Sequence, residues 1–374
     1  MMSDMNLEFG RCADSWVSIQ SVTANSVRMR FGLNVLTTEI SAVLYCGDAE
    51  VKCFVPHSAN SAGQIFFDNL QPDTDYVIEF SAAGNSCRRA FRTLVEPKGE
   101  KLFKMAIFAD LHISCTNEDL HGRLHSESRN LMQLAFTGAV ERNCDVAIFP
   151  GDVVDEGYQE EYLAVNAALK YLTIPFYMTP GNHDICNGGT ERFAEFFGEG
   201  TYLKELHGYQ LLALDTGNGY LNKPEIHAAV AALDPTQPVI LFTHHQLFAD
   251  EWIPDANRVI ADADDPANAA TLEKLTRCRT IAYIGHKNVA ARLVKGNLLQ
   301  LNMPQLTHFP AGYLEATFYT DGIWHEFIPV NSEILNEYSR RGTEFARYHS
   351  HPACDCKSKY RDGYTLKYWN GVVK

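Results

Sequence analysis

The most informative part of this sequence is the stretch Thr179-Pro180-Gly181-Asn182-His183-Asp184. The apolar run at positions 174–178 ends there in a Pro-Gly turn, which presents an amide, an imidazole and a carboxylate in succession. Burying these groups without partners would be costly, so polar, charged or metallic neighbours are expected around them. Taken alone, the stretch is also compatible with an ordinary polar loop.

Four further apolar runs end directly in residues of the kinds that bind metal ions. They are 105–109 before Asp110 and His112, 146–150 before Gly151 and Asp152, 239–243 before His244 and His245, and 281–284 before Gly285, His286 and Asn288. Short apolar runs of this kind are typical of strands buried on both faces, and open α/β sheets gather their sites at strand ends. The pattern therefore predicts five loops that meet at one edge of an α/β core.

In this order the motifs resemble those of the calcineurin-like metallophosphoesterases. The matching residues are Asp110-Leu111-His112, Gly151-Asp152, Gly181-Asn182-His183-Asp184, His244 and Gly285-His286-Lys287-Asn288. The resemblance covers residues 101 to about 330, and each motif follows a predicted strand, which is the structural context that it requires. It implies two divalent cations about 3.5–4 Å apart and a hydroxide held between them as the nucleophile.

The resemblance also implies a role for each motif residue. One metal ion would be held by Asp110, His112, Asp152 and Asn288, and the other by Asp152, Asn182, His244 and His286. Asp152 would be the bridging ligand. His183 would be the general acid that protonates the departing alkoxide, with an acidic partner, Asp184 or Asp155, setting its tautomer.

The sequence departs from the family pattern at Asn288, where the family has a second His. An amide oxygen is a harder donor than an imidazole, which favours manganese, magnesium or iron over zinc at that position. We therefore expect two divalent ions, with manganese preferred. His308 is an alternative source of the missing ligand. In addition, purple acid phosphatases have Tyr where Asp155 stands, so a ferric charge-transfer site is not expected.

Three further residues follow apolar runs or lie beside a motif residue. His245 is expected to pack beside its neighbour or to support a metal ligand. Lys287 either contacts a substrate phosphate or is a solvated loop side chain. Asp215 follows another apolar run, at 211–214, and is expected to cap a turn.

The chain is predicted to contain an all-β region followed by an α/β region. Alternating runs between positions 16 and 93 predict a β-sandwich, and Leu70-Gln71-Pro72-Asp73-Thr74-Asp75-Tyr76 resembles the tyrosine corner of fibronectin type III domains. We place this domain at 1–96, a metallophosphoesterase αββα sandwich at 101–330 and a C-terminal extension at 331–374. Helices are expected at 126–141, 160–172 and 266–277, the last capped by Asp265, and a hairpin at Asp321-Gly322.

Composition limits the classes of protein that fit. The 374 residues are 46% hydrophobic and 21% charged, which is typical of a soluble protein with two domains. A formal net charge of -14 argues against nucleic acid or anionic membranes as partners. With no recognisable signal peptide or apolar run of about 20 residues, we expect a cytoplasmic protein with reduced cysteines. The cluster of His349, His351, Cys354 and Cys356 is therefore expected to be a reduced loop, with a zinc site as the alternative.

These observations favour a hydrolase that cleaves a small phosphate monoester or diester. The loops at 115–123, 217–224 and 249–265 would select the substrate, and the β-sandwich would narrow access or mediate homo-oligomer formation. The alternative is a metal-binding scaffold or interaction protein on the same fold with little or no turnover, since a fold alone does not establish activity.

Overall fold

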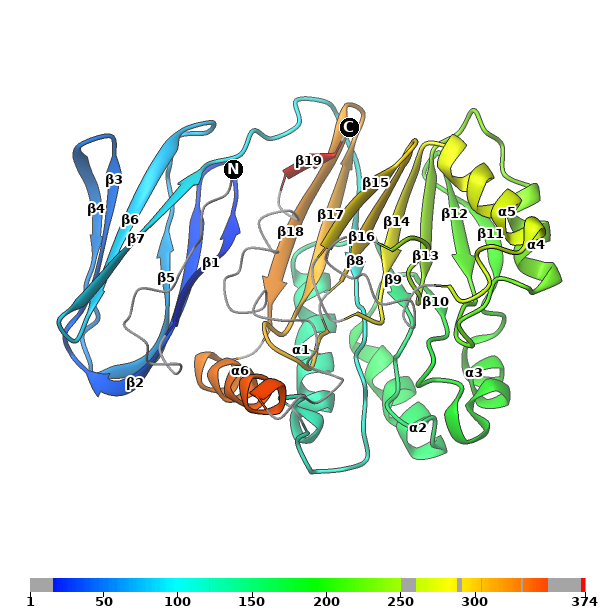
Figure 1. The fold of residues 1–374 in the computed structure, drawn as a ribbon, viewed down its shortest axis with the longest axis horizontal. Coiled ribbons are helices and arrows are strands. Elements are labelled where there is room, and N and C mark those ends of the chain that lie inside the picture. The colour runs from blue at the N-terminus through cyan, green and yellow to red at the C-terminus, as the bar shows by residue number, and fades with distance from the viewer. Residues whose placement is uncertain are drawn as a thin grey trace.

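The computed structural model describes residues 16–120, 122–249, 260–287, 291–303, 305–330, 332–348 and 371–373. Strands at the N-terminal side form two sheets of their own, and the following strands and helices form a mixed α/β core (Figure 1). The predicted architecture, an all-β region followed by an αββα sandwich, is confirmed.

The N-terminal region consists of two antiparallel sheets. One has the order β1 (Trp16–Val22), β2 (Val27–Thr37), β5 (Asn60–Phe67), and the other β4 (Ala49–Phe54), β3 (Ile40–Cys46), β6 (Asp75–Ala82), β7 (Asn85–Arg92). Along β6 every second side chain is buried, namely Tyr76, Ile78, Phe80 and Ala82. These side chains pack with those of the other sheet into one apolar core.

Two six-stranded sheets form the α/β core. The first has the order β10 (Phe176–Thr179), β9 (Val146–Pro150), β8 (Lys101–Ile107), β17 (Gly312–Tyr319), β18 (Gly322–Pro329), β19 (Gly371–Val373). The second has the order β11 (Tyr202–Leu206), β12 (Tyr209–Leu214), β13 (Val239–Thr243), β14 (Thr280–Ile284), β16 (Leu298–Asn302), β15 (Ala291–Lys295). Strands β8, β9 and β10 are parallel, as are β12, β13, β14 and β16, so their carboxyl ends share an edge.

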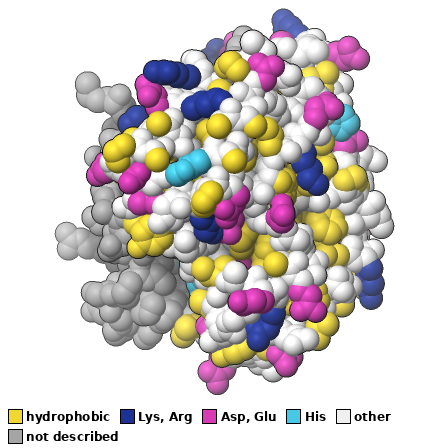
Figure 2. Space-filling model, turned by 90° about the vertical axis from the view of Figure 1, so that its right-hand side faces the viewer, with side chains coloured by type: hydrophobic (Ala, Val, Ile, Leu, Met, Phe, Trp, Pro, Cys, Tyr) yellow, Lys and Arg dark blue, Asp and Glu magenta, His cyan; other side chains and the backbone are white. Residues whose placement is uncertain are grey.

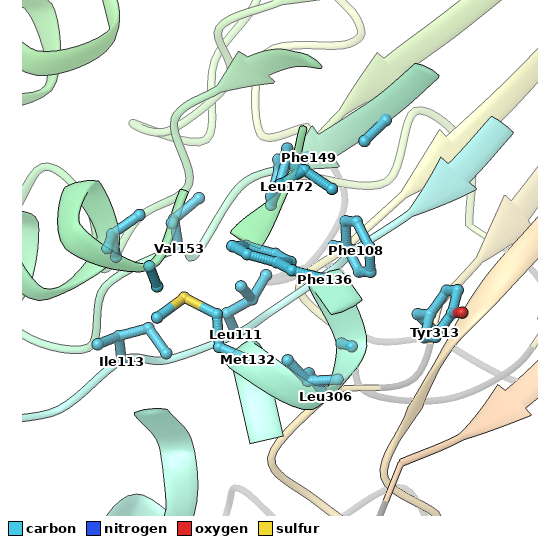
Figure 3. Close-up of a cluster of buried hydrophobic side chains, with 14 of the residues drawn as sticks. Phe108, Leu111, Ile113, Met132, Phe136, Phe149, Val153, Leu172, Leu306 and Tyr313 are labelled. Atoms are coloured by element: carbon cyan, nitrogen blue, oxygen red, sulfur yellow. The ribbon is translucent and has the colours of Figure 1, made fainter. Parts of the chain in front are cut away.

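The two sheets pack face to face, and helices cover their outer faces. Met105 and Ile107 of β8 meet Ile240 and Phe242 of β13 between the sheets. Outside the first sheet lie α1 (Ser128–Glu141), α2 (Gln159–Ala168) and α3 (Gly189–Phe197); outside the second lie α4 (Pro224–Ala231) and α5 (Pro266–Arg277). Figure 3 shows Phe136 and Met132 of α1 among the side chains that pack on the outer face of the first sheet. The strands are therefore buried on both faces, as their continuous apolar runs predict.

Local sequence signals explain several element boundaries. The Asp265 side chain accepts a hydrogen bond from the Ala267 amide at 2.9 Å, and Pro266 is the first residue of α5. The predicted cap and helix are therefore confirmed. The hairpin at Asp321-Gly322 is also confirmed, since β17 and β18 flank it. The first predicted helix begins as the 3-10 turn His125–Glu127, and the second ends at Ala168 before another 3-10 turn.

Helix α6 (Glu333–Tyr348) lies between the N-terminal sheets and the α/β core (Figure 1). The buried Arg30 of β2 pairs with Glu333 at 3.1 Å, and the Arg341 side chain donates a hydrogen bond to the Leu33 carbonyl at 3.0 Å. Beyond α6, β19 pairs with β18. The cysteine and histidine cluster at positions 349–356 lies outside the described residues.

Charged side chains of both signs lie on the surface (Figure 2). Figure 2 shows acidic and basic side chains interspersed on the face that it presents. Among the residues described, no helix is both long enough and apolar enough to cross a lipid bilayer.

Candidate metal centre

The carboxyl ends of strands from both sheets bring the motif residues together in unusual backbone conformations. Asp110, His112, Asp152 and His286 all have positive φ, between 45° and 69°. Such conformations cost about 1–3 kcal/mol each for residues other than glycine and concentrate at functional sites. The strain is therefore located at the same positions that the motifs identify.

The first donor group consists of Asp110, His112 and Asp152. The Nε2 atom of His112 lies 3.9 Å from Oδ1 of Asp110 and 3.6 Å from Oδ2 of Asp152. Both distances are too long for hydrogen bonds, and all three side chains are buried. Buried polar atoms that face one point without bonding each other fit a cation.

The second donor group shares Asp152 and adds His244, His286 and Asn182. Nε2 of His244 lies 3.2 Å from Oδ2 of Asp152 and 3.0 Å from Oδ1 of Asn182. Nδ1 of His286 lies 3.2 Å from the same Nε2 atom. Because one oxygen of Asp152 faces both groups, its geometry suits a carboxylate shared between two cations.

Hydrogen bonds fix the orientation of two histidines. His244 Nδ1 lies 3.0 Å from the Pro150 carbonyl, and His112 Nδ1 lies 3.0 Å from Oδ1 of Asp155. A carbonyl or carboxylate oxygen can only accept a hydrogen bond, so Nδ1 of each ring carries the proton. The lone pair of each Nε2 atom therefore faces the donor group. Support of this kind is usual for metal-binding histidines.

The electrostatics of the cluster favour bound positive charge. Burial raises the pKa of the Asp110 carboxyl. Burial alone would lower the pKa of His244, but the Asp152 and Asp110 carboxylates raise it above its usual value. The cluster therefore attracts protons, and divalent cations would satisfy the same carboxylates.

His183 lies beside the first donor group, and Asp155 orients it. Its backbone amide donates to Oδ1 of Asp152 at 2.9 Å, and its Nδ1 bonds the Asp155 carbonyl oxygen. Oδ1 of Asp155 lies 3.7 Å from the same ring nitrogen. With 30% of its side chain exposed, His183 can reach a substrate through Nε2.

Asp184 has a different environment from Asp155. Its Oδ1 accepts hydrogen bonds from the Val153 and Val154 amides, and its Oδ2 accepts one from the Gly181 amide, at 2.7–2.9 Å. The carboxylate is fully buried and binds backbone groups with both oxygens. Asp184 therefore holds the loops after β9 and β10 together, and of the two candidate partners only Asp155 approaches the His183 ring in the described structure.

Glycines allow these loops to approach each other closely. A Cβ atom on Gly151 would lie 2.6 Å from Nδ1 of His244, and one on Gly181 would lie 2.5 Å from the Asp152 amide nitrogen. A Cβ on Gly285 would lie 2.6 Å from the Pro150 carbonyl oxygen. At each of these three positions a Cβ atom would overlap a neighbouring group, so only glycine fits.

The remaining candidates are placed as follows. Asp215 caps its turn, as predicted, by accepting from the Gly217 amide at 3.0 Å. Lys287 and His308 are buried, so Lys287 is not a solvated side chain, and His308 belongs to neither of the two donor groups formed by the described residues. His245 is buried beside His244 and His286. Asn288 lies outside the described residues, so its prediction stays open.

Two residues at the site carry no motif signal in the sequence. Arg123 donates to Oδ1 of Asp155 at 3.1 Å, and Nε2 of the buried His125 lies 3.5 Å from Oδ2 of the same residue. Burial alone would raise the pKa of Asp155, but the His112 hydrogen bond and the Arg123 charge hold it well below its usual value. Arg123 is the last residue of the 115–123 loop, and His125 follows two positions later. They approach Asp155 only in the folded structure, so no local sequence pattern identifies them.

The αββα sandwich and its paired donor groups place this chain among the metal-dependent phosphoesterases. A model of the calcineurin-like phosphoesterases matches residues 103–289, half of the chain, so the chain belongs to that family. The class predicted from the five motifs is thereby confirmed.

Individual relatives match over shorter regions. The chain is 34% identical over 113 residues to a probable glycerophosphodiester phosphodiesterase GpdQ of Arcobacter nitrofigilis, covering 27% of this chain and 41% of the relative. It is 29% identical over 80 residues to the glycerophosphodiester phosphodiesterase GpdQ of Enterobacter lignolyticus, covering 21% and 29%. Less than half of each relative's length is therefore matched. A dimetal phosphatase from Danio rerio has a TM-score of 0.46 at 12% identity, covering 61% of this chain and 96% of that structure.

Proposed function

We propose that this protein hydrolyses a phosphodiester with a dinuclear metal centre and with His183 as general acid. The observation that carries the proposal is the position of Asp152, whose Oδ2 atom faces His112 at 3.6 Å and His244 at 3.2 Å. A carboxylate shared in this way suits two adjacent cations. The preference for a diester over a monoester is supported by the two GpdQ relatives.

The described residues supply donors for both positions. Asp110, His112 and Asp152 would hold one cation, and Asp152, Asn182, His244 and His286 the other. When bound, the cations would activate water and neutralise the charge of the phosphoryl group. The carboxylate and amide oxygens make manganese the metal that we favour, with Asn288 as the proposed completing ligand.

His183 would supply the proton that the leaving alkoxide needs. As the bond between phosphorus and the leaving oxygen breaks, the electron pair stays on that oxygen, and Nε2 of His183 donates its proton there. Asp155 assists because its carbonyl oxygen holds Nδ1 and its carboxylate lies 3.7 Å away. Asp184 would act as a positioning residue through the backbone of Gly181.

We also propose that residues 1–96 form a fibronectin type III-like domain. The Tyr76 hydroxyl accepts a hydrogen bond from the Gln71 amide at 3.0 Å, within the stretch that resembles the tyrosine corner. The arrangement of three and four strands in two antiparallel sheets supports the same assignment. No candidate ligand motif lies in this region, so we infer that it is dispensable for the chemistry.

The proposal is tested by turnover of a glycerophosphodiester and of the matching glycerophosphate monoester, each with manganese, magnesium, iron(II) and zinc. We expect the diester to be cleaved with the higher kcat/KM, best with manganese, and Asp152→Asn to lose both metal and activity. Preference for the monoester would overturn the substrate assignment. Two tightly bound ions without turnover of either ester would favour the scaffold alternative.

A further inference from the structure

His245 is a buried histidine for which the proposed mechanism has no use. Only 6% of it is exposed, its Nδ1 atom has no hydrogen-bond partner among the residues that the structure describes, and its backbone amide donates to Oγ1 of Thr216 at 3.0 Å. Its ring packs on that of His286, with centroids 4.3 Å apart and planes at 38°. His245 is therefore held firmly beside the second donor group.

The surroundings of the ring decide which nitrogen carries the proton. A neutral imidazole has one N–H donor and one acceptor nitrogen. Since Nδ1 is buried with no partner among the described residues, a proton there would be a buried donor with no acceptor to bind, which costs free energy. The favoured tautomer therefore has its proton on Nε2.

Nε2 faces the loop that follows β12. A Cβ atom on Gly219 would lie 3.9 Å from it, but Gly219 has none, and its φ of +81° favours glycine. Hydrogen bonds hold this loop in place, since the Gly219 amide donates to the Thr216 carbonyl at 2.8 Å and the Gly219 carbonyl accepts from the Ala261 amide at 2.9 Å. Because residue 219 is a glycine, it places no side chain in front of Nε2.

The same loop also borders the Asn182 and His183 motif. A Cβ atom on Gly217 would lie 3.0 Å from the Gly181 carbonyl oxygen. His183 packs against His112 of the first donor group, with ring centroids 4.6 Å apart, whereas His245 packs against His286 of the second. His183 and His245, neither of which has a proposed metal role, are thus associated with different donor groups.

We propose that His245 is a substrate-binding residue whose Nε2–H donates a hydrogen bond to an anionic oxygen of the phosphoryl group. The proposal rests on the proposed phosphoesterase function and assigns this residue a role in it. An anionic oxygen is the acceptor that gives a neutral donor its strongest hydrogen bond. His245 holds the phosphoryl group beside the second donor group, while His183 serves the leaving oxygen.

The test compares His245→Phe with His245→Gln. Phenylalanine keeps a flat ring against His286 but removes the donor, whereas glutamine keeps a donor without the ring. Loss of a hydrogen bond to a charged group weakens binding about ten- to one-hundredfold. In the manganese-loaded full chain we expect His245→Phe to raise the Kd of inorganic phosphate, measured by calorimetry, and the KM of the diester by that factor. We expect kcat to change less than about threefold and metal content to stay at the wild-type level.

Controls separate this role from a structural one. His245→Gln should recover part of the phosphate affinity, and His227→Gln, on α4 and hydrogen-bonded to Asn268, should match the wild type. Unchanged phosphate affinity in a fully metal-loaded His245→Phe protein would overturn the inference while leaving the proposed function intact. Affinity that falls only in proportion to metal content would also overturn it, because His245 would then support His286. A wild-type protein that neither binds metal nor cleaves esters would instead remove the function itself.

Discussion

Asp155 connects two residues with different proposed tasks. One oxygen of its carboxylate lies 3.0 Å from Nδ1 of His112 and 3.7 Å from Nδ1 of His183. Arg123 donates to the same oxygen. A single carboxylate therefore orients both a proposed metal ligand and the proposed acid, so its loss would affect both metal binding and proton transfer.

The proposed role of His183 as general acid gives a direct prediction. His183→Ala should lower kcat for an unactivated ester by about 10²–10⁴, the usual contribution of general acid catalysis, without changing metal content. Esters with strongly acidic leaving groups should lose much less, because their alkoxides need no proton. The measurement is kcat against leaving-group pKa for both proteins, with metal content from atomic emission. A wild-type rate on an unactivated ester would remove His183 from the mechanism.

At this scale the sequence predicts residue types well and side-chain directions poorly. The motifs name Asp110, His112, Asp152, His244 and His286, and the structure brings these residues together. The choice between Asp184 and Asp155 cannot be made from the sequence, since both are close to His183 and both are acidic. It depends on backbone amides of the loop after β9, which bind Asp184 and leave Asp155 facing the histidines.

At the scale of elements, the loops after β9 and β10 form one unit. The Asp184 carboxylate binds amides of both loops, and the Tyr162 hydroxyl of α2 donates to the Asp184 carbonyl at 2.6 Å. Gly181 lies directly against Asp152. The proposed bridging carboxylate, Asp152, and the proposed general acid, His183, are therefore positioned by the same contacts.

This packing predicts the effect of Gly181→Ala. The new methyl group would lie 2.5 Å from the Asp152 amide nitrogen and closer still to Oδ1, so the loop must shift. Misplacing catalytic groups by about 1 Å can cost 10²-fold in rate, and we expect a loss of at least that size together with lower metal occupancy.

The matched control is Gly138→Ala in α1, where the methyl group would meet Oη of Tyr313 at 3.4 Å, an ordinary contact. Its activity should equal that of the wild type, and its stability should change by no more than about 1 kcal/mol. If the activity of Gly181→Ala equals that of the wild type, the loops after β9 and β10 are more adaptable than their contacts indicate.

Elements with strong local signals are the ones that the sequence predicts correctly. Helix α5 has a capping Asp and an initial Pro, and β13 and β14 are continuous apolar runs. In contrast, the side chains of β4 (Ala49–Phe54) are mostly exposed, so its alternation of apolar and polar residues marks no buried face. Helix α3 is short and follows Gly188 in a left-handed conformation. Such elements form because of their neighbours, which a local pattern does not encode.

At the scale of the whole molecule, α6 connects the N-terminal sheets with the rest of the chain. Burial lowers the pKa of the Arg30 guanidinium to about 10, although Glu333 raises it. Arg30 is almost fully buried, whereas 26% of the Glu333 side chain is exposed. The pair is formed by residues at nearly opposite ends of the sequence, so no local pattern predicts it.

The pair predicts a stability effect that is separate from activity. Glu333→Gln should leave the buried Arg30 charge without its counter-ion and lower the free energy of unfolding by about 2 kcal/mol, less than for a fully buried pair. The matched control is Glu273→Gln on α5, whose partner Arg277 is largely exposed, with an expected change below about 0.5 kcal/mol. Urea unfolding at pH 7 measures both. Wild-type kcat in Glu333→Gln would agree with a dispensable N-terminal region, whereas a large loss would connect that region to catalysis.

The second donor group takes Asp152 from one sheet and His244 and His286 from the other. A cation held there would join the two layers of the sandwich, and no fragment containing only one sheet could form the group. Metal capture would therefore come late in folding, after the sheets have docked. Removing the ions should consequently accelerate unfolding more than it slows folding, because the missing bonds are ones that the folding transition state has not yet formed.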